Sequence, residues 1–262
     1  FSSMENTQEQ KRNKLFIILA GIFITNALLA EMIGVKIFSA ESTLGLQPAH
    51  FNILGFTMDF NLTAGAVIWP VVFITTDLIN EYFGKPGVKR ISYFTASLIA
   101  YAFVVIFITI RLSPADFWAT VKDGNGNDFN MDFAFGKIFG QGQRIIIGSL
   151  TAFLLGQLVD VFVFQQLRKV TGSKKLWLRA TGSTLVSQFI DSFVVLFIAF
   201  YGVFTNQQII AIGITNYIYK FTVAIALTPL IYLGHAWIDS YLGKEQAEKI
   251  SAQAAKQSDG FF

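Results

Sequence analysis

Two copies of a Gln-x-x-Asp pattern are the residues in this sequence best suited to chemistry. Gln157 and Asp160 form one copy, and Gln188 and Asp191 form the other. Residues three apart share a helix face, so each copy presents an amide, which donates and accepts hydrogen bonds, beside a carboxylate, which only accepts. Such pairs can bind a small molecule that carries both donors and acceptors. The alternative is hydrogen bonding between helices that only holds a bundle together.

Both copies lie inside long apolar runs. Hydrophobic residues make up 53% of the 262 residues and charged residues only 14%, whereas a soluble domain carries about 25% charged residues. About 20 apolar residues suffice for a helix to cross the hydrocarbon core. The sequence therefore predicts an all-α integral membrane protein with six transmembrane helices, at about 15–38, 62–83, 91–111, 143–167, 180–204 and 209–238.

Basic residues alternate between the segments that connect these runs. Fourteen of the twenty Lys and Arg lie in the two tails and in the second-to-third and fourth-to-fifth connections. The positive-inside rule then predicts an N-in/C-in protein. Its parts would be a cytoplasmic tail over 1–14, a transmembrane domain over 15–240 and a cytoplasmic tail over 241–262, with residues 1–3, before Met4, left over from cloning. Segment 112–142 would be an outside loop with a short amphipathic piece on the membrane, acting as a plug or a gate.

Further polar residues occur within the predicted spans. A charge at the centre of a membrane helix costs roughly 2.5–3.5 kcal/mol, so such residues are expected to face the interior of the bundle. Besides the two Gln-x-x-Asp pairs, they are Asn26, Glu31, Asp77, Glu81 and Lys220. Pro70 and Pro229 should each break a span.

Three of these positions keep alternatives open. Glu81 either faces the interior or pairs with Lys85 at the interface. Trp69 is either an interfacial belt residue or a stacking surface. Lys220 lies at the midplane and needs a partner such as Asp191 if the last span is 209–233, but lies near the outer face if it is 214–238.

Other classes of site find no support in the sequence. There is no cysteine, and the two histidines, His50 and His235, stand alone, so neither a metal site nor a thiol nucleophile is expected. We find no phosphate-binding loop, nucleophile elbow or dinucleotide fingerprint. The sequence therefore predicts no catalytic residue, no cofactor and no nucleic-acid partner, although an intramembrane enzyme with paired carboxylates stays as a third hypothesis.

Four polar blocks together resemble the queuosine precursor transporter family, earlier grouped with vitamin uptake transporters. The blocks are Asn26-Ala27-Leu28-Leu29-Ala30-Glu31, residues 75–85, 156–162 and 187–193, and the resemblance runs from about residue 15 to about residue 240. It implies a six-helix importer in the bacterial inner membrane. Its substrates would be 7-deazaguanine bases, chiefly 7-cyano-7-deazaguanine, with the aminomethyl relative as a further substrate.

The polar residues suit a ligand of this class. A carboxylate can accept from the ring N–H and amino group of the base, an amide can donate to its carbonyl, and an aromatic ring can stack on it. We therefore expect a secondary carrier or facilitator, or alternatively a substrate-binding module that needs a separate ATPase engine. The partners would be a purine-like base and the lipid bilayer, with a homodimer left open. The expected substrate-binding residues are Asn26, Glu31, Trp69, Asp77, Glu81, Gln157, Asp160, Gln188, Asp191 and Lys220.

Overall fold

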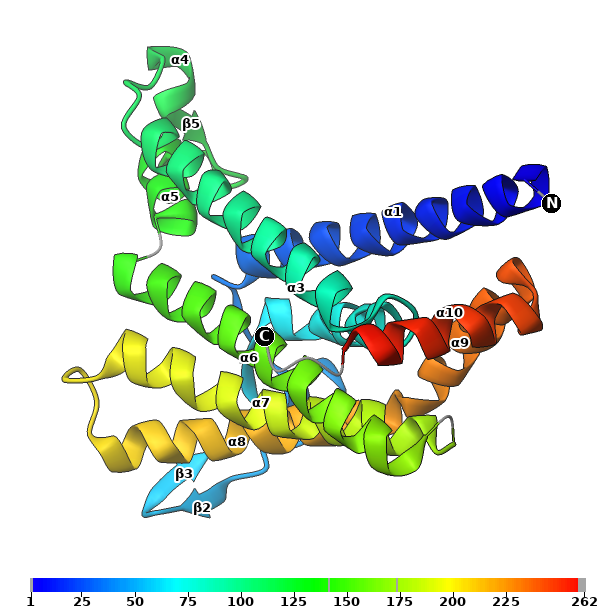
Figure 1. Ribbon diagram of the computed structural model, residues 1–262. Coiled ribbons are helices and arrows are strands. Elements are labelled where there is room, and N and C mark those ends of the chain that lie inside the picture. Colours follow the sequence, from blue (N-terminus) through cyan, green and yellow to red (C-terminus); the bar gives the residue numbers. More distant parts are fainter. Residues whose placement is uncertain (1, 141, 173, 259–262) are drawn as a thin grey trace.

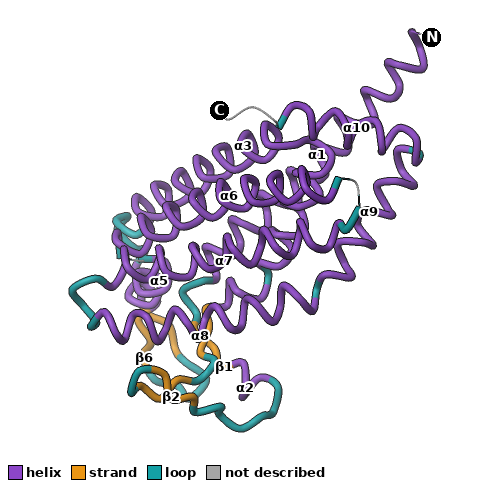
Figure 2. Tube along the Cα trace, turned by 60° about the horizontal axis from the view of Figure 1, so that its bottom comes forward, coloured by secondary structure: helices purple, strands orange, loops and turns teal. Residues whose placement is uncertain are grey.

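The computed structural model describes residues 2–140, 142–172 and 174–258, and most of these are helical. Phe1 and residues 259–262, which belong to the two predicted tails, lie outside the described residues. The long helices form a bundle in which α3, α6, α7 and α8 lie side by side (Figures 1 and 2). The main helices are α1 (Ser2–Ile33), α3 (Trp69–Thr109), α6 (Gln143–Thr171), α7 (Leu176–Phe200), α8 (Asn206–Ala226), α9 (Thr228–Leu242) and α10 (Lys244–Gln257).

Among the described residues, five helical stretches are long and apolar enough to cross a membrane. They are Gln8–Ile33, Trp69–Thr109, Met131–Thr171, Leu176–Phe200 and Asn206–Ala226. The predicted all-α membrane class is therefore confirmed. The number differs from the six predicted runs because α3 takes in two of them, 62–83 and 91–111.

Gly84 divides α3 into two arms. Its φ of 65° and ψ of −170° are not helical, so the chain turns there between Trp69–Phe83 and Lys85–Thr109. Glycine adopts a positive φ at little cost, and a side chain has no room here. A Cβ on Gly84 would lie 2.6 Å from the carbonyl oxygen of Ala254 on α10. The two arms are therefore separate helical elements that Gly84 joins without a loop.

Of the two prolines predicted to break a span, Pro229 lies beside such a break, whereas Pro70 lies at the start of a helix. Pro70 stands in the first turn of α3 and Pro229 in the first turn of α9. A proline costs no hydrogen bond in that position because the first N–H groups of a helix have no partner within it. The predicted run 209–238 is divided at Leu227, where α8 ends and α9 begins.

Small two-stranded antiparallel sheets and short helices connect the long helices. The strand pairs are β1 (Ile37–Ser39) with β4 (Asn61–Thr63), β2 (Phe51–Ile53) with β3 (Phe56–Met58), and β5 (Thr120–Lys122) with β6 (Asp128–Asn130). The short helices are α2 (Ala40–Thr43), η1 (Ala64–Val67), α4 (Asp116–Ala119) and α5 (Met131–Phe139). Helix α5 is the short piece expected within segment 112–142, and the Asn130 side chain caps it by accepting from the Phe133 N–H at 2.8 Å.

Small residues let α6 and α7 pack closely. A Cβ added to Gly148 would lie 3.2 Å from the carbonyl oxygen of Val195, and one added to Gly156 would lie 3.6 Å from the Cβ of Asp191. Ala152, one turn from each glycine, is buried. Small side chains permit such close approach between membrane helices. The packing brings the two Gln-x-x-Asp pairs within reach of one another.

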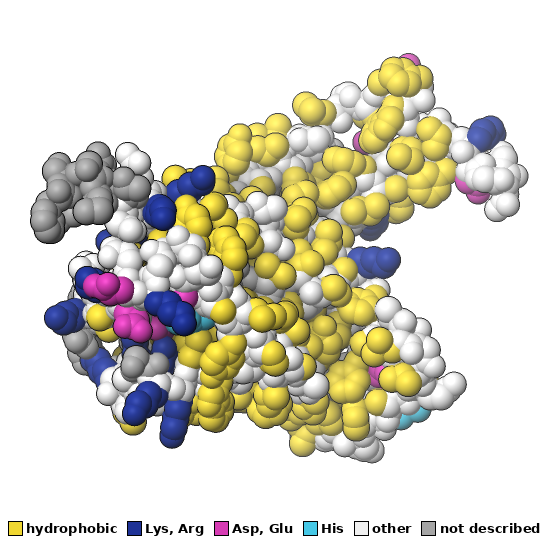
Figure 3. Space-filling view, turned by 90° about the vertical axis from the view of Figure 1, so that its right-hand side faces the viewer, with side chains coloured by type: hydrophobic (Ala, Val, Ile, Leu, Met, Phe, Trp, Pro, Cys, Tyr) yellow, Lys and Arg dark blue, Asp and Glu magenta, His cyan; other side chains and the backbone are white. Residues whose placement is uncertain are grey.

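The outer surface of the bundle is largely apolar. Large hydrophobic side chains such as Tyr101, Phe107 and Phe162 are at least 47% exposed. Figure 3 shows hydrophobic side chains over most of one face, with many of the Lys and Arg gathered toward one end. Exposed apolar surface of this extent is what lipid contact requires.

Candidate functional site

The two Gln-x-x-Asp pairs converge between α6 and α7. Gln157, Asp160 and Gln188 are buried, and the Ser187 hydroxyl donates to Asp160 Oδ1 at 3.2 Å. Gln157, Gln188 and Asp191 line one pocket of about 260 Å³, measured to its open side, together with Trp69, Phe73, Phe153, Gly156 and Ser187. Three of the four side chains therefore face a shared hollow, whereas Asp160 is buried and is not among the residues that line it.

A second pocket adjoins the first. It measures about 510 Å³ to its open side, and Asp77, Thr184, Tyr219 and Lys220 contribute its polar groups. Trp69 and Phe73 line both pockets, so they form a common aromatic wall between them. Their rings are nearly parallel, with centroids 5.7 Å apart and an interplanar angle of 16°. The space open to the centre of a water-sized sphere is only about 40 Å³ in the larger pocket and about 10 Å³ in the smaller one, so a planar heterocycle could enter only if the surrounding side chains or helices move apart.

Several buried polar atoms at these pockets have no hydrogen-bond partner among the described residues. They include Asp77 Oδ1 and Gln188 Oε1, and Oδ2 of the buried Asp160, which lines neither pocket, is likewise unpaired. Leaving such an atom unpaired costs about 1–3 kcal/mol. Gln157 differs, since its Oε1 accepts from the Thr76 hydroxyl at 3.2 Å. The free oxygens are acceptors that a ligand with N–H groups can satisfy.

An ion pair spans the two pockets. Lys220 Nζ lies 2.5 Å from Asp191 Oδ2. Lys220 lines the larger pocket and Asp191 the smaller one, and the two side chains are 19% and 24% exposed. This is the partner that the sequence required if Lys220 lay at the midplane. Because both side chains border open space, the pair can respond to a bound molecule.

Glu31 and Asn26 on α1 are not among the residues that line the two pockets. Both carboxylate oxygens of Glu31 lie 2.6 Å from the Ser149 hydroxyl on α6. Asn26 donates to the carbonyl oxygen of Ile22 on its own helix at 2.8 Å. The structure thus brings Trp69, Asp77, Gln188 and Lys220 together with the other Gln-x-x-Asp residues, but places these two apart from them.

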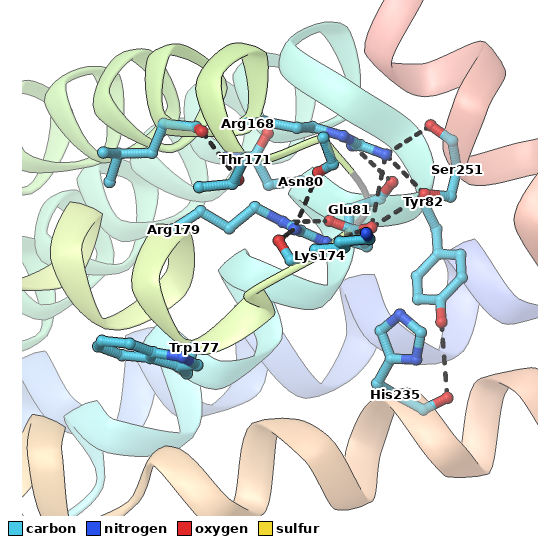
Figure 4. Close-up of polar contacts among 12 residues, drawn as sticks. Asn80, Glu81, Tyr82, Arg168, Thr171, Lys174, Trp177, Arg179, His235 and Ser251 are labelled. Carbon is cyan, nitrogen blue, oxygen red and sulfur yellow. Dashed lines mark hydrogen bonds and ion pairs between the residues drawn. The ribbon is translucent and has the colours of Figure 1, made fainter.

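Glu81 belongs to a buried cluster of charges at the end of the bundle that α10 covers. Arg179 Nε and Nη2 donate to its two oxygens at 3.0 and 2.9 Å, and Arg168 Nη2 lies 3.4 Å from Oε1 (Figure 4). The Ser251 hydroxyl on α10 also donates to Oε1, at 2.9 Å. All four side chains are buried or half-buried, so this is an internal ion cluster.

Arg168 and Arg179 were not expected in a site, because basic residues at the ends of the predicted spans were interpreted as topology signals. A signal was present for Arg168. It follows Gln157 by eleven residues, about three helical turns, which places both on one face of α6. A basic residue on the polar face of a membrane helix needs an acidic partner, and Glu81 is that partner.

A third pocket opens beside this cluster, and we call it the inner opening. It measures about 1500 Å³ to its open side and lies between α3, α6, α9 and α10. Within it, Asp239 accepts from the Tyr82 hydroxyl at 2.9 Å and lies 3.0 Å from His235 Nδ1. Over residues 2–140, 142–172 and 174–258, no group of three His, Cys, Asp or Glu side chains could hold a metal ion.

Comparison with known proteins identifies the family. The profile of a family described as "Putative vitamin uptake transporter" matches residues 63–234. A Bacillus subtilis protein named "Probable queuosine precursor transporter" is 32% identical over 187 residues, which are 70% of this chain and 77% of that protein. The chain belongs to the queuosine precursor transporter family. It is thus a multi-pass protein of the bacterial inner membrane, and its family is one of transporters rather than of enzymes.

Two other members of the queuosine precursor transporter family extend the comparison. An Escherichia coli (strain K12) protein named "Queuosine precursor transporter" is 30% identical over 177 residues, which cover 66% of this chain and 71% of that protein. A Haemophilus influenzae protein named "Probable queuosine precursor transporter" is 29% identical over 234 residues, 86% of this chain and 87% of that protein. No solved structure matches the chain. The profile match spans every residue of the two pockets.

Proposed function

We propose that the protein imports 7-deazaguanine bases across the inner membrane as a secondary carrier or facilitator. The substrates would be 7-cyano-7-deazaguanine and its aminomethyl relative. The names of three relatives support the class of substrate. The observation that carries the proposal is that Asp77 Oδ1 and Gln188 Oε1, which line the pockets with the aromatic wall, are buried acceptors with no partner among the described residues, as is Oδ2 of the buried Asp160.

The chemistry of a deazaguanine complements these groups. Its ring N–H and exocyclic amino group are donors, so a carboxylate such as Asp77 or Asp160 can accept from both. Its carbonyl is an acceptor that the amide of Gln157 can reach with its N–H groups, because Thr76 already occupies the amide oxygen. The flat face of the base can stack on the wall of Trp69 and Phe73, a contact worth roughly 1–3 kcal/mol.

The other predicted site residues take supporting places in this proposal. The Lys220–Asp191 pair borders the base and sets the charge of the pocket. Glu31 supports the bundle from α1 through Ser149, next to Asp191. Asn26 has no contact with the pockets, so in our proposal any role it has lies in another conformation of the carrier.

We further propose six spans with both ends in the cytoplasm. At 1.5 Å per residue, a straight α3 of 41 residues would measure ~60 Å, about twice the ~30 Å hydrocarbon core. The turn at Gly84 resolves this excess if each arm is one span. An even number of spans places the basic tails on the same side, as the positive-inside rule requires.

Uptake assays with matched variants test the site. In cells that cannot make the precursor, Asp77→Asn and Asp160→Asn should each reduce base uptake by ~10- to 100-fold, because each removes an acceptor and leaves a buried donor of the base unpaired, at a cost of ~1–3 kcal/mol. Asp116→Asn, at an exposed position in α4, is the control and should leave uptake unchanged. Normal uptake by both pocket variants would refute the site. Base uptake by the purified protein in liposomes would decide against the module that needs an ATPase.

A further inference from the structure

Only one helical turn separates the base pocket from the inner opening. Asp77 lines the pocket, whereas Glu81, four residues later on the same helix, lines the inner opening. One turn of an α-helix rises about 5.4 Å. Buried polar side chains at this level include Asn80, which accepts from Gln165 at 2.6 Å, and the Glu81 cluster. The centroid of the fully buried Phe164 ring lies 5.8 Å from the guanidinium carbon of Arg179, so polar and apolar side chains together separate the two spaces.

We propose that the cluster of Glu81, Arg179, Arg168 and Ser251 is the cytoplasmic gate of the carrier, and that α10 is its moving part. The proposal rests on the proposed function and adds the exit route. A base leaving the pocket would pass Glu81 into the inner opening once α10 has moved away. Ser251, to which the sequence assigned no role, and Arg168, interpreted there as a topology signal, thereby become residues that hold the gate shut.

Helix α10 closes the cluster through polar contacts. Arg168 Nη2 donates to the Ser251 carbonyl oxygen at 2.7 Å and to its hydroxyl at 2.5 Å, while that hydroxyl donates to Glu81. These contacts complete the partners of Arg168, whose distance to Glu81 is 3.4 Å. An arginine buried without partners would be costly. If α10 moved away, Arg168 would instead face the water of the inner opening, so release of α10 need not leave a buried charge unpaired.

The attachment of α10 is suited to reversible motion. Its buried face is small and made of Ala247, Ile250 and Ala254. Gly243, with φ 86° and open space around it, joins α10 to α9 and can act as a hinge. At the far end, the Lys85 N–H donates to the Ser258 hydroxyl at 2.9 Å. A hinge at one end and a polar latch at the other would let α10 swing as a unit.

A reversible crosslink tests the gate, because the wild-type chain has no cysteine. The contact between Lys85 and Ser258 places their Cα atoms close to the ~4.4–6.8 Å separation that a disulfide spans. In liposomes, the oxidised Lys85→Cys/Ser258→Cys protein should import base at less than about a tenth of the rate of the reduced protein, because a lid held shut stops turnover. The two single variants, treated with the same oxidant, are the controls. Equal rates for a crosslinked and a reduced sample would overturn the gate.

Thiol labelling provides a test that does not require transport. Ala254 is fully buried on the inward face of α10, whereas Ala252 on the same helix is exposed. Purified Ala254→Cys should react with a maleimide ~10-fold or more slowly than Ala252→Cys, since a buried thiol reacts only in the opened fraction. Adding 7-cyano-7-deazaguanine should change the rate at Ala254→Cys alone.

The outcomes separate the two proposals. If wild type neither imports the base nor is thermally stabilised by it, the proposed function fails. If wild type binds the base, but labelling at Ala254→Cys is as fast as at Ala252→Cys or is indifferent to the base, the gate fails and the function stands. A base-dependent rate at Ala254→Cys together with arrest by the crosslink supports both.

Discussion

Replacing Trp69 with alanine should weaken base binding more than it weakens the fold. Trp69 lines both pockets, and its ring lies 5.7 Å from Phe73 and 5.9 Å from Phe153 between centroids. Loss of one stacking partner costs about 1–3 kcal/mol, and every 1.4 kcal/mol is tenfold in the dissociation constant. Because Phe73 remains as part of the wall, we expect the lower half of that range, ~5- to 20-fold weaker binding.

Thermal unfolding with and without ligand measures this loss. A ligand present at 100 times its dissociation constant stabilises the protein by ~2.7 kcal/mol, and a tenfold weaker site at the same concentration gives only ~1.4 kcal/mol. The stabilisation by 7-cyano-7-deazaguanine should therefore fall by about half in Trp69→Ala. Trp69→Phe keeps a flat ring in place and should retain most of the stabilisation.

The ligand-free melting temperature separates binding from folding. Trp69→Ala removes a half-buried ring, so some loss of stability without ligand is expected. The prediction concerns the rise in melting temperature that the base produces in each variant. If this rise is the same in Trp69→Ala as in wild type, Trp69 is an interfacial belt residue and the base does not stack there.

Three further changes test the frame around the pocket. Glu81→Gln leaves a buried arginine without its counter-charge and should lower the stability by ~3–5 kcal/mol in thermal unfolding; an unchanged melting temperature would contradict this. Gly84→Ala strains a positive φ and should cost ~1–3 kcal/mol or more, whereas Gly124→Ala, with open space around it, should stay within ~0.5 kcal/mol. Burial raises the pKa of Glu41, but hydrogen bonds, first from the Phe60 N–H, outweigh burial and hold the pKa below its ordinary value. Glu41 thus stabilises its loop fully when the pH is above the ordinary pKa of a glutamate. The hydrogen-exchange protection of the Phe60 amide should fall as the pH drops through the lowered pKa.

Hydropathy predicted where the long helices lie but not how they join. The runs 62–83 and 91–111 were found, yet they meet at Gly84 without a loop, because a positive φ leaves no trace in an average over apolar residues. The C-terminal tail was assigned as a tail alone. Its buried residues Ala247, Ile250 and Ala254 follow helical spacing, which was a readable signal of an element that packs on another.

The polar residues of the pocket were easier to predict than those of the cluster at Glu81. A carboxylate or amide deep inside an apolar run, such as Asp160, is expected to face the interior. A basic residue near the end of a run is harder to interpret, because it also serves as a topology signal. Arg168 and Arg179 fell in the second group, and only the structure shows them buried against Glu81. The position of a residue along the chain therefore predicts whether it faces the interior better than it predicts which residue it contacts.

The distribution of satisfied and unsatisfied polar groups separates a binding site from mere bundle packing. If the buried polar residues only held helices together, each would be expected to have its partner within the bundle. That holds toward the α10 end, where Glu81 is bonded to Arg179 and Ser251. It fails at the pockets, where Asp77 and Gln188 each keep an oxygen without a partner among the described residues. Other described residues, such as Asn80 and Ser92, also keep an unpaired buried polar atom, but the unpaired carboxylate oxygens are those of Asp77 and Asp160, which a donor-rich flat molecule could satisfy.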